Sequence, residues 1–160
     1  MRMLLVILIV LLGGAFTAGC ARSGHRRLPR DARNMTTAPP NRTPEARSMQ
    51  VGRVLTFAEA QLGKPYCWGG EGPRCFDCSG LAQMAYSRAG LRIPRTSHDM
   101  AEHLPEVPME EAQAGDILWW PGHVAIYEGE GWVIDAFNSR EGVVRRYGFT
   151  DPPHRALRPY

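Results

Sequence analysis

The strongest constraint on the fold is a change of hydrophobic pattern within residues 49–160. Apolar residues recur at helical spacing over 49–63 and 78–89, and a short third helix is expected from Thr96 or Ser97 to His103 or Leu104. Farther along, short apolar or β-branched runs alternate with Gly, Pro and Asn, which is typical of strands (116–120, 123–127, 132–136, 143–147 and 156–160). Helices followed by strands predict an α+β fold, with the helices packed on an antiparallel sheet.

Residues 1–20 have the pattern of a secretory signal: a short basic start, an unbroken apolar run over 4–12 and small residues up to Cys20. A helix over residues 3–18 would reach only about 24 Å, which is short for a membrane span. The end of the segment, Thr17-Ala18-Gly19-Cys20, is similar to the lipobox of bacterial lipoproteins, so we expect lipid on Cys20. An uncleaved anchor and simple secretion are the alternatives. All three place the rest of the chain outside the cytoplasm, on the periplasmic side or the outer face of the envelope.

Residues 21–48 are rich in Arg and Pro and contain almost no large apolar residues, which predicts a disordered tether. The chain's net charge of +3 arises here, because residues 49–160 contain 14 acidic and only 11 basic residues. We expect the positive tether to hold the protein near an anionic envelope surface. The tether lacks the aromatic residues that stack on bases, so no nucleic-acid partner is expected.

The four cysteines bear on the chemistry. If lipid consumes Cys20, three thiols remain in an exported protein, so at least one is unpaired. Cys78 is the candidate, because it follows Asp77, a good N-cap, at the predicted start of the second helix. The partial positive charge of a helix N-terminus favours the thiolate, which is the nucleophilic form. The sequence therefore predicts a nucleophilic cysteine at position 78.

Five short motifs surround this cysteine in a fixed order. They are Gly63-Lys64-Pro65-Tyr66-Cys67-Trp68-Gly69-Gly70, Phe76-Asp77-Cys78-Ser79-Gly80-Leu81, Pro94-Arg95-Thr96-Ser97, Ala114-Gly115-Asp116-Ile117-Leu118 and Gly122-His123-Val124-Ala125-Ile126-Tyr127. In this order they resemble the motifs of the NlpC-type cysteine peptidases. These are papain-like bacterial enzymes that hydrolyse peptidoglycan stem peptides, commonly between γ-D-glutamyl and a diamino acid. The resemblance covers about residues 50–147 and implies a papain-like α+β fold that needs no cofactor.

The resemblance implies the catalytic roles residue by residue. Cys78 is the expected nucleophile, and His123 is the expected general base that later protonates the leaving amine. The family's third polar residue lies twelve positions after the histidine and is usually His, whereas this chain has Asp135 there. A carboxylate accepts a hydrogen bond from the imidazole and stabilises its cation, so Asp135 suits this role chemically.

Other residues are expected around the substrate. Tyr66 matches a family tyrosine whose hydroxyl helps to bind the substrate or the oxyanion, with plain packing as the alternative. The backbone N–H groups of Cys78 and Ser79 are further expected donors to the oxyanion. Arg95 and Ser97 fall in the expected groove, where they would meet substrate carboxylates or simply be solvated.

Cys67 and Cys75 flank the glycine-rich loop before the nucleophile. In an oxidising compartment, a disulfide between them would staple this loop and leave Cys78 free. Cys75 and Cys78 also form a C-x-x-C pair, for which thiol–disulfide exchange or half of a zinc site is the alternative. No second C-x-x-C follows, and His98 and His103 do not share one helical face, so no metal is expected.

The sequence thus predicts a membrane-tethered, monomeric cysteine endopeptidase acting on peptidoglycan, with a signal segment (1–20), a tether (21–48) and a catalytic domain (49–160). Three alternatives stay open. The same Cys, His and Asp set would serve an amidase or acyltransferase. A non-catalytic wall-binding lipoprotein would keep the fold without the chemistry. A thiol–disulfide or zinc module would use Cys67, Cys75 and Cys78.

Overall fold

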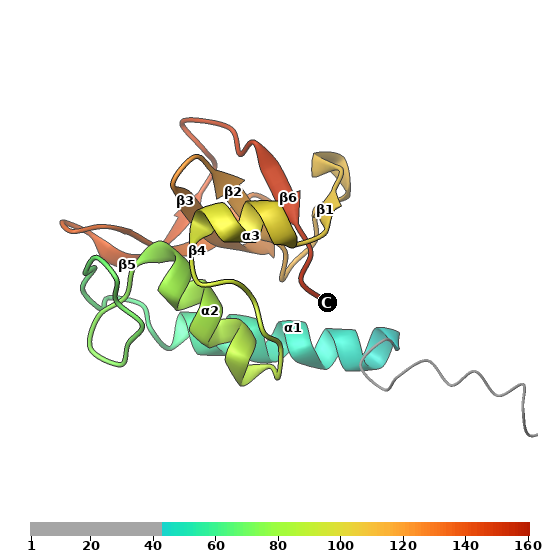
Figure 1. Cartoon of the computed structure of the whole chain (residues 1–160), viewed down its shortest axis with the longest axis horizontal. Helices are drawn as coiled ribbons and strands as arrows, with labels where there is room; N and C mark the ends of the chain where they lie inside the picture. Colours follow the sequence, from blue (N-terminus) through green and yellow to red (C-terminus); the bar gives the residue numbers. More distant parts are fainter. Residues whose placement is uncertain (1–42) are drawn as a thin grey trace, which may run out of the picture. The chain divides into compact units, whose positions relative to one another are not determined.

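The computed structural model describes residues 43–160; the predicted signal segment and residues 21–42 of the predicted tether lie outside the described residues. The described chain has helices α1 (Pro44–Glu59), α2 (Cys78–Arg88) and α3 (Ser97–His103), followed by a six-stranded sheet (Figure 1). The strands are β1 (Glu106–Val107), β2 (Ile117–Trp120), β3 (His123–Gly129), β4 (Trp132–Asn138), β5 (Gly142–Tyr147) and β6 (Arg155–Leu157), with a 3-10 turn, η3 (Met109–Glu111), after β1. All strand pairs are antiparallel, in the order β1-β6-β2-β3-β4-β5. The predicted α+β fold is confirmed.

Helix α1 begins earlier than the apolar pattern predicted. Thr43 is its N-cap and accepts a hydrogen bond from the backbone N–H of Ala46 at 3.1 Å, while Pro44 lies in the first turn. A threonine hydroxyl satisfies a free N–H at this position, and the fixed φ of proline suits the first turn. The helix therefore starts at Pro44, so residues 44–48, which we expected in the tether, are helical. Within residues 43–160, no helix combines the length and the apolar character needed to cross a membrane.

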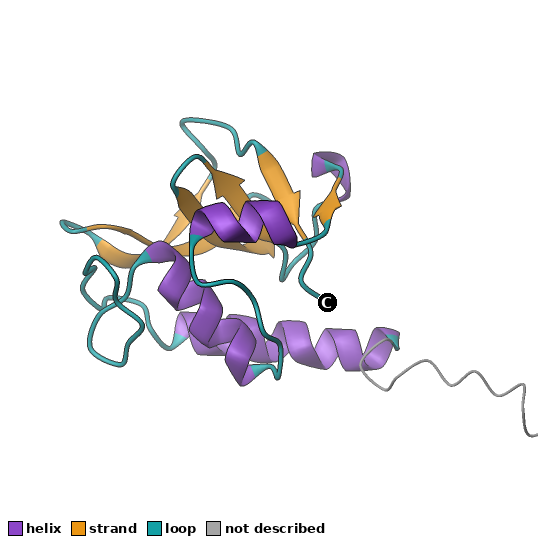
Figure 2. Ribbon diagram, in the orientation of Figure 1, coloured by secondary structure: helices purple, strands orange, loops and turns teal. Residues whose placement is uncertain are grey.

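The apolar side chains of the sheet divide between its two faces, because successive residues of a strand point in opposite directions. In β2, Ile117 belongs to the main core and Leu118 to a second, smaller cluster. The helices contribute fully buried Val54, Leu81 and Met100 to the main core. All three helices therefore pack on the same face of the sheet (Figure 2).

The second cluster lies on the opposite face. Its buried members are Leu118, Ala125, Val133 and Ala156. Trp120 and Phe149 pack against them. By alternation, His123 in β3 shares this face with Ala125, and Asp135 in β4 shares it with Val133. Two of the three predicted catalytic side chains thus belong to the face away from the helices.

Four predicted strands correspond closely to β2, β3, β4 and β5. Strand β1 was not predicted, because two residues carry too little pattern to reveal a strand. The last predicted strand, 156–160, is observed as the shorter β6, which pairs with both β1 and β2 and so lies between them. Strand β1 is therefore joined to the rest of the sheet through β6.

Candidate active site

Cys78 is the first residue of α2 and the one free cysteine among the described residues. The N-cap, Asp77, accepts a hydrogen bond on its Oδ1 from the N–H of Gly80 at 2.6 Å, and its carbonyl accepts one from the N–H of Leu81 at 3.0 Å. The N–H groups of Cys78 and Ser79 come earlier in the turn, where no intrahelical acceptor is available. The thiol therefore lies at the positive end of a helix, beside two backbone donors of the kind that stabilise an oxyanion.

A short pairing between two loops fixes the segment that leads into Cys78. The N–H of Phe76 donates to the carbonyl of Pro65 at 3.1 Å, and the N–H of Cys67 donates to the carbonyl of Phe76 at 3.0 Å. A disulfide between Cys67 and Cys75 closes the glycine-rich loop between the paired segments. The start of the nucleophile's helix is thereby joined to the loop that carries the first sequence motif.

Tyr66 borders the same groove as Cys78. Burial raises the pKa of its phenol, and the negative charges of Cys78 and Asp77 raise it further. The hydroxyl therefore keeps its proton at neutral pH and can donate a hydrogen bond toward a substrate oxygen.

His123 and Asp135 meet across adjacent strands. His123 is the first residue of β3, and Asp135 lies inside β4. Nε2 of His123 donates to Oδ2 of Asp135 at 2.6 Å. The carboxylate is fully buried, whereas the imidazole keeps 23 % of its surface exposed and lines the same groove as Cys78. The structure thus brings together the three residues that the sequence nominated for catalysis.

The surroundings of His123 favour its charged form. Burial acts against the imidazolium, but the hydrogen bonds and the negative charges of Asp135 and Cys78 outweigh it and raise the pKa of His123 from 6.5 to about 9. At neutral pH the imidazole is therefore protonated next to the thiol. In this state the ring carries the proton that general acid catalysis requires.

Sequence reasoning missed Arg146, a residue of β5 that binds the same carboxylate. Its Nε donates to Oδ1 of Asp135 at 3.1 Å, and its Nη2 donates to Oδ2 at 2.7 Å. Such a two-point contact fixes the plane of the carboxylate as well as its position. Arg146 pairs with Val133 in the sheet, and Asp135 lies two residues farther along the same face of β4. Because strand register alone creates this contact, no local motif could have revealed it.

Arg95 lies at the centre of a second polar network. Its Nη2 donates to Asp77 at 2.8 Å, its Nη1 to the hydroxyl of Ser79 at 2.9 Å, and its Nε to Glu71 at 2.6 Å. Burial acts against the carboxylate of Asp77, but the hydrogen bonds from Arg95 and the Gly80 N–H outweigh it and lower the pKa of Asp77. Arg95 thus fastens the N-cap of α2 to the glycine-rich loop.

These residues surround a groove of about 440 Å³ that opens over the thiol. Its walls include Tyr66, Trp68, Asp77, Cys78, Ser79, Arg95, Ser97 and His123. The residues nominated from sequence for catalysis or substrate contact, apart from buried Asp135, therefore border one groove. Trp68 is 91 % exposed on the loop that the disulfide closes, so it forms part of the rim and none of the core.

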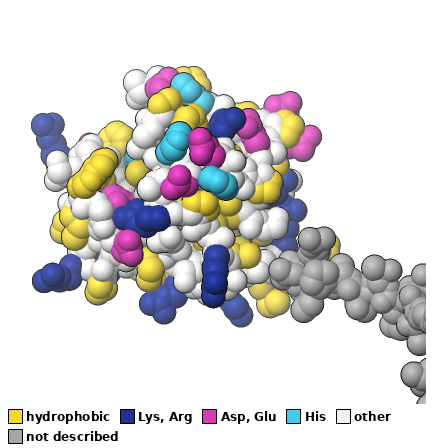
Figure 3. Space-filling view, in the orientation of Figure 1, with side chains coloured by type: hydrophobic (Ala, Val, Ile, Leu, Met, Phe, Trp, Pro, Cys, Tyr) yellow, Lys and Arg dark blue, Asp and Glu magenta, His cyan; other side chains and the backbone are white. Residues whose placement is uncertain are grey.

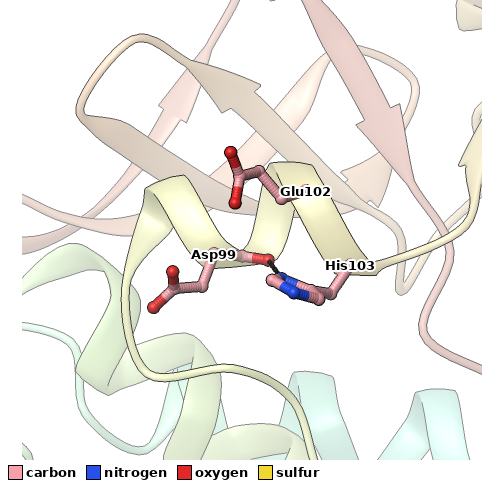
Figure 4. A group of neighbouring side chains, drawn as sticks. All are labelled: Asp99, Glu102 and His103. Carbon is pink, nitrogen blue, oxygen red and sulfur yellow. Dashed lines mark hydrogen bonds between the residues drawn. The ribbon is translucent and has the colours of Figure 1, made fainter.

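A separate group of acidic and histidine side chains gathers over α3 (Figure 3). Asp99, Glu102 and His103 bring potential ligand atoms within 4.8 Å of one another (Figure 4). Glu102 and His103 are exposed, Asp99 accepts a hydrogen bond from the hydroxyl of Thr96 at 2.7 Å, and Nδ1 of His103 is 2.9 Å from the Asp99 carbonyl oxygen. None of the three lines the thiol groove, and we assign them no metal.

A thiol carried by a helix and an imidazole–carboxylate pair carried by a sheet define a site of the cysteine-hydrolase type. Residues 63–155 match the NlpC/P60 family, and the chain belongs to this family.

Three relatives place the chain within that family. A protein named a probable endopeptidase from Corynebacterium glutamicum is 43 % identical over 108 residues, which cover 66 % of this chain and 52 % of that protein. The chain thus spans about half the length of that relative. The solved structure of the peptidoglycan hydrolase RipB from Mycobacterium tuberculosis has a TM-score of 0.64 and 33 % identity, covering 75 % of this chain and 71 % of that one. RipD from the same organism, described as a non-catalytic NlpC/p60 domain protein adapted to peptidoglycan binding, has a TM-score of 0.61 and 28 % identity, covering 69 % and 98 %.

Proposed function

We propose that this protein is a cysteine endopeptidase that hydrolyses peptidoglycan stem peptides in the cell envelope. The observation that carries the proposal is the free thiol of Cys78 at the N-terminus of α2, which shares one groove with His123, while His123 in turn is held by buried Asp135. Membership of the NlpC/P60 family and the likeness to a peptidoglycan hydrolase support peptidoglycan as the substrate.

In the proposed reaction, the thiolate of Cys78 attacks the carbonyl carbon of the scissile amide. The N–H groups of Cys78 and Ser79 stabilise the oxyanion, with the hydroxyl of Tyr66 in reach of the same groove. The C–N bond then breaks, and the amine departs with the proton of His123, which leaves a thioester. Water attacks the thioester while His123 takes up a proton, the C–S bond breaks, and the acid is released with the thiolate–imidazolium pair restored.

We propose the bond between γ-D-glutamyl and a diamino acid as the scissile bond, on the strength of the resemblance between the five motifs and those of the family. The groove is lined by both polar and aromatic side chains, which suits a peptide substrate. An amidase or acyltransferase would use the same thiol, because the three catalytic residues determine the type of reaction, acyl transfer, and do not determine which acyl group is transferred. Product identity therefore decides between these reactions.

We further propose that the chain is exported and held at the membrane by lipid on Cys20. Residues 1–20 support this proposal through their apolar run and lipobox-like end, and the basic residues that follow would add attraction to anionic lipid. The folded domain then begins near Thr43, and the tether is correspondingly shorter than residues 21–48. Metabolic labelling with a fatty acid tests the anchor: wild type should carry label, and Cys20→Ala should lose it and leave the membrane fraction.

One comparison tests the activity. The full-length protein in detergent, wild type and Cys78→Ala, is incubated with purified peptidoglycan, and the released muropeptides are identified by mass spectrometry. Wild type should release fragments cut after γ-D-glutamyl, and Cys78→Ala should release none. Ser87→Ala, at an exposed position of the same helix, is the matched control and should behave like wild type.

A non-catalytic wall-binding role, as described for RipD, would appear as peptidoglycan binding by wild type with no released fragments. Identical product profiles for wild type and Cys78→Ala would refute the peptidase proposal. The thiol–disulfide or zinc module on Cys67, Cys75 and Cys78 is not supported, because Cys67 and Cys75 are joined to each other and leave only Cys78 of the three free.

A further inference from the structure

A second groove, which we call the α1–α2 groove, lies between the first two helices. It has a volume of about 560 Å³. Its walls include Met49, Arg53, Thr56 and Phe57 of α1 and Arg88, the last residue of α2. It shares no lining residue with the thiol groove, so it is a separate feature of the surface.

The walls of the α1–α2 groove combine apolar and positively charged side chains. Met49 is 60 % exposed, and the guanidinium of Arg88 lies 5.7 Å from the centre of the Phe57 ring. The two acidic residues of α1, Glu45 and Glu59, do not line the groove, and α2 contains no acidic residue. The groove therefore presents apolar surface beside positive charge, with no carboxylate in its walls.

Charged side chains are unevenly distributed over the molecule. Figure 3 shows Lys and Arg along the edge formed by α1 and α2, and mostly Asp, Glu and His over α3. Within residues 43–160, neither Arg53 nor Arg88 forms a salt bridge. The charge of both guanidinium groups is thus available to an anionic partner.

Charge and apolarity together select among three occupants of the α1–α2 groove. Residues 21–42 contain six arginines and one aspartate, so like charge disfavours this segment of the chain. A second copy of the same face would bring arginine against arginine. An anionic lipid bilayer attracts both arginines and takes up the exposed apolar side chains at its interface. Of the three, anionic lipid fits both properties of the groove.

The proposed anchor would keep the groove close to such a bilayer. Helix α1, which carries most of the groove, begins at Pro44. As the predicted tether, residues 21–42 would span about 26 Å between the lipid on Cys20 and this helix. At so short a range the effective concentration of lipid is high, so a contact of modest affinity is sufficient to hold the domain on the surface.

We propose that the α1–α2 groove, with Arg53 and Arg88, is the surface through which the folded domain contacts an anionic lipid bilayer. The inference rests on the proposed lipid anchor and goes beyond it, because it states which face of the domain meets the membrane. Cys78 begins α2 and Arg88 ends it, so the 11 residues of this helix separate the thiol from the groove by about 16 Å. Contact through Arg88 therefore leaves the thiol groove open to peptidoglycan.

A quencher carried by the lipid shows which face lies at the bilayer. Full-length lipidated protein is bound to vesicles of equal parts phosphatidylglycerol and phosphatidylcholine, with a nitroxide on some of the headgroups. Because the disulfide and the lipid occupy the other cysteines, the Cys78→Ala background gives a single introduced thiol for a fluorophore. A fluorophore on Thr56→Cys, in the α1–α2 groove, should be quenched. One on Ser139→Cys, at an exposed position between β4 and β5, should not.

Charge variants test the role of the two arginines. An arginine near an anionic surface favours contact by about fivefold, so Arg53→Gln/Arg88→Gln should lower the ratio of bound to unbound domain about thirtyfold and abolish most of the quenching at position 56. Arg140→Gln/Arg145→Gln removes the same charge from exposed positions outside the groove and should leave the quenching unchanged. Vesicles of phosphatidylcholine alone should quench position 56 weakly.

Several results would overturn the proposed membrane surface: equal quenching at positions 56 and 139, quenching that survives Arg53→Gln/Arg88→Gln, or equal quenching on neutral vesicles. Two fluorophores on one chain, detected by intact mass, would reveal an unlipidated Cys20 and overturn the anchor on which the inference rests. Muropeptide release is measured separately, with Cys78 intact. A protein that cuts no peptidoglycan but keeps the quenching pattern would refute the proposed endopeptidase and leave the membrane surface in place.

Discussion

Replacement of Asp135 by Asn tests the most specific electrostatic feature of the site. The substitution keeps the size of the side chain and removes its charge, so a change in His123 is attributable to the lost carboxylate. It also leaves the guanidinium of Arg146 close to the imidazole without its partner anion. Both effects disfavour the imidazolium.

The magnitude follows from the pKa of His123, which is raised from 6.5 to about 9 against the opposing effect of burial. That difference corresponds to about 3 kcal/mol in favour of the charged ring. The hydrogen bond to Asp135 is the largest of the contributions that raise the pKa, ahead of Cys78. In Asp135→Asn, burial and the uncompensated cation act with less opposition, and the pKa of His123 should fall by about two units.

The assay is an NMR titration of the His123 ring between pH 5 and 11 in wild type and Asp135→Asn. Asp151→Asn is a stringent control, because it removes an exposed carboxylate from the same neighbourhood and should shift the pKa of His123 far less. A pKa that stays near 9 in Asp135→Asn would refute the electrostatic role of this carboxylate.

The pH dependence of stability should reflect the same interactions of His123. Because the folded pKa of His123 lies above its ordinary value, its interactions stabilise the fold fully below about pH 6.5, and this contribution is lost as pH rises through about 9. The free energy of unfolding of wild type should therefore lose up to about 3 kcal/mol more than that of Asp135→Asn across this range. Parallel pH profiles for the two proteins would contradict the assignment.

Three further changes have calculable outcomes. Arg146→Met should lower kcat about tenfold or more with a smaller effect on KM, because the carboxylate of Asp135, which orients the imidazole, loses both contacts. Arg146→Lys should recover part of the rate. A change in KM alone would contradict this role of Arg146. Replacing Cys67 and Cys75 together by Ser should lower the free energy of unfolding by about 2.5 kcal/mol, as expected for a bond that closes a loop with a sequence separation of 8, and denaturant titration checks this. Gly80→Ala should destabilise the folded protein by about 1 to 3 kcal/mol, because the new Cβ would collide with the backbone carbonyl of Gly70 in the glycine-rich loop. Gly52→Ala is the control: its Cβ would meet open space, so it should stabilise α1 by up to about 1 kcal/mol. Equal effects of the two substitutions in thermal unfolding would argue against the collision.

The fold was accessible from sequence wherever a local pattern determines an element. Asp77 followed by Cys78 predicted the start of α2 because N-capping involves only neighbouring residues. The same logic was available for α1, where Thr43 and Pro44 carried a start signal that the apolar pattern obscured. Strand β1 gave no such signal, because its two residues become a strand only by pairing with β6.

In the candidate site, too, the sequence indicated some residues and only the folded structure revealed another. The ordered motifs nominated Cys78, His123 and Asp135, although nothing local to those motifs indicated Arg146. Its contact with Asp135 depends on the register between β4 and β5, which is set by packing across the sheet.

By itself, then, the sequence determined the order of helices and strands and the thiol at a helix N-terminus, because propensity and capping act over a few residues. The partners of the thiol were implied by the resemblance of the five motifs to those of a known family. Only the tertiary structure decided that Arg95 ties the N-cap to the glycine-rich loop and that Arg146 shares the carboxylate with His123. These features join residues from separate strands and loops. Their geometry exists only once the sheet has its register and the helices have packed against it.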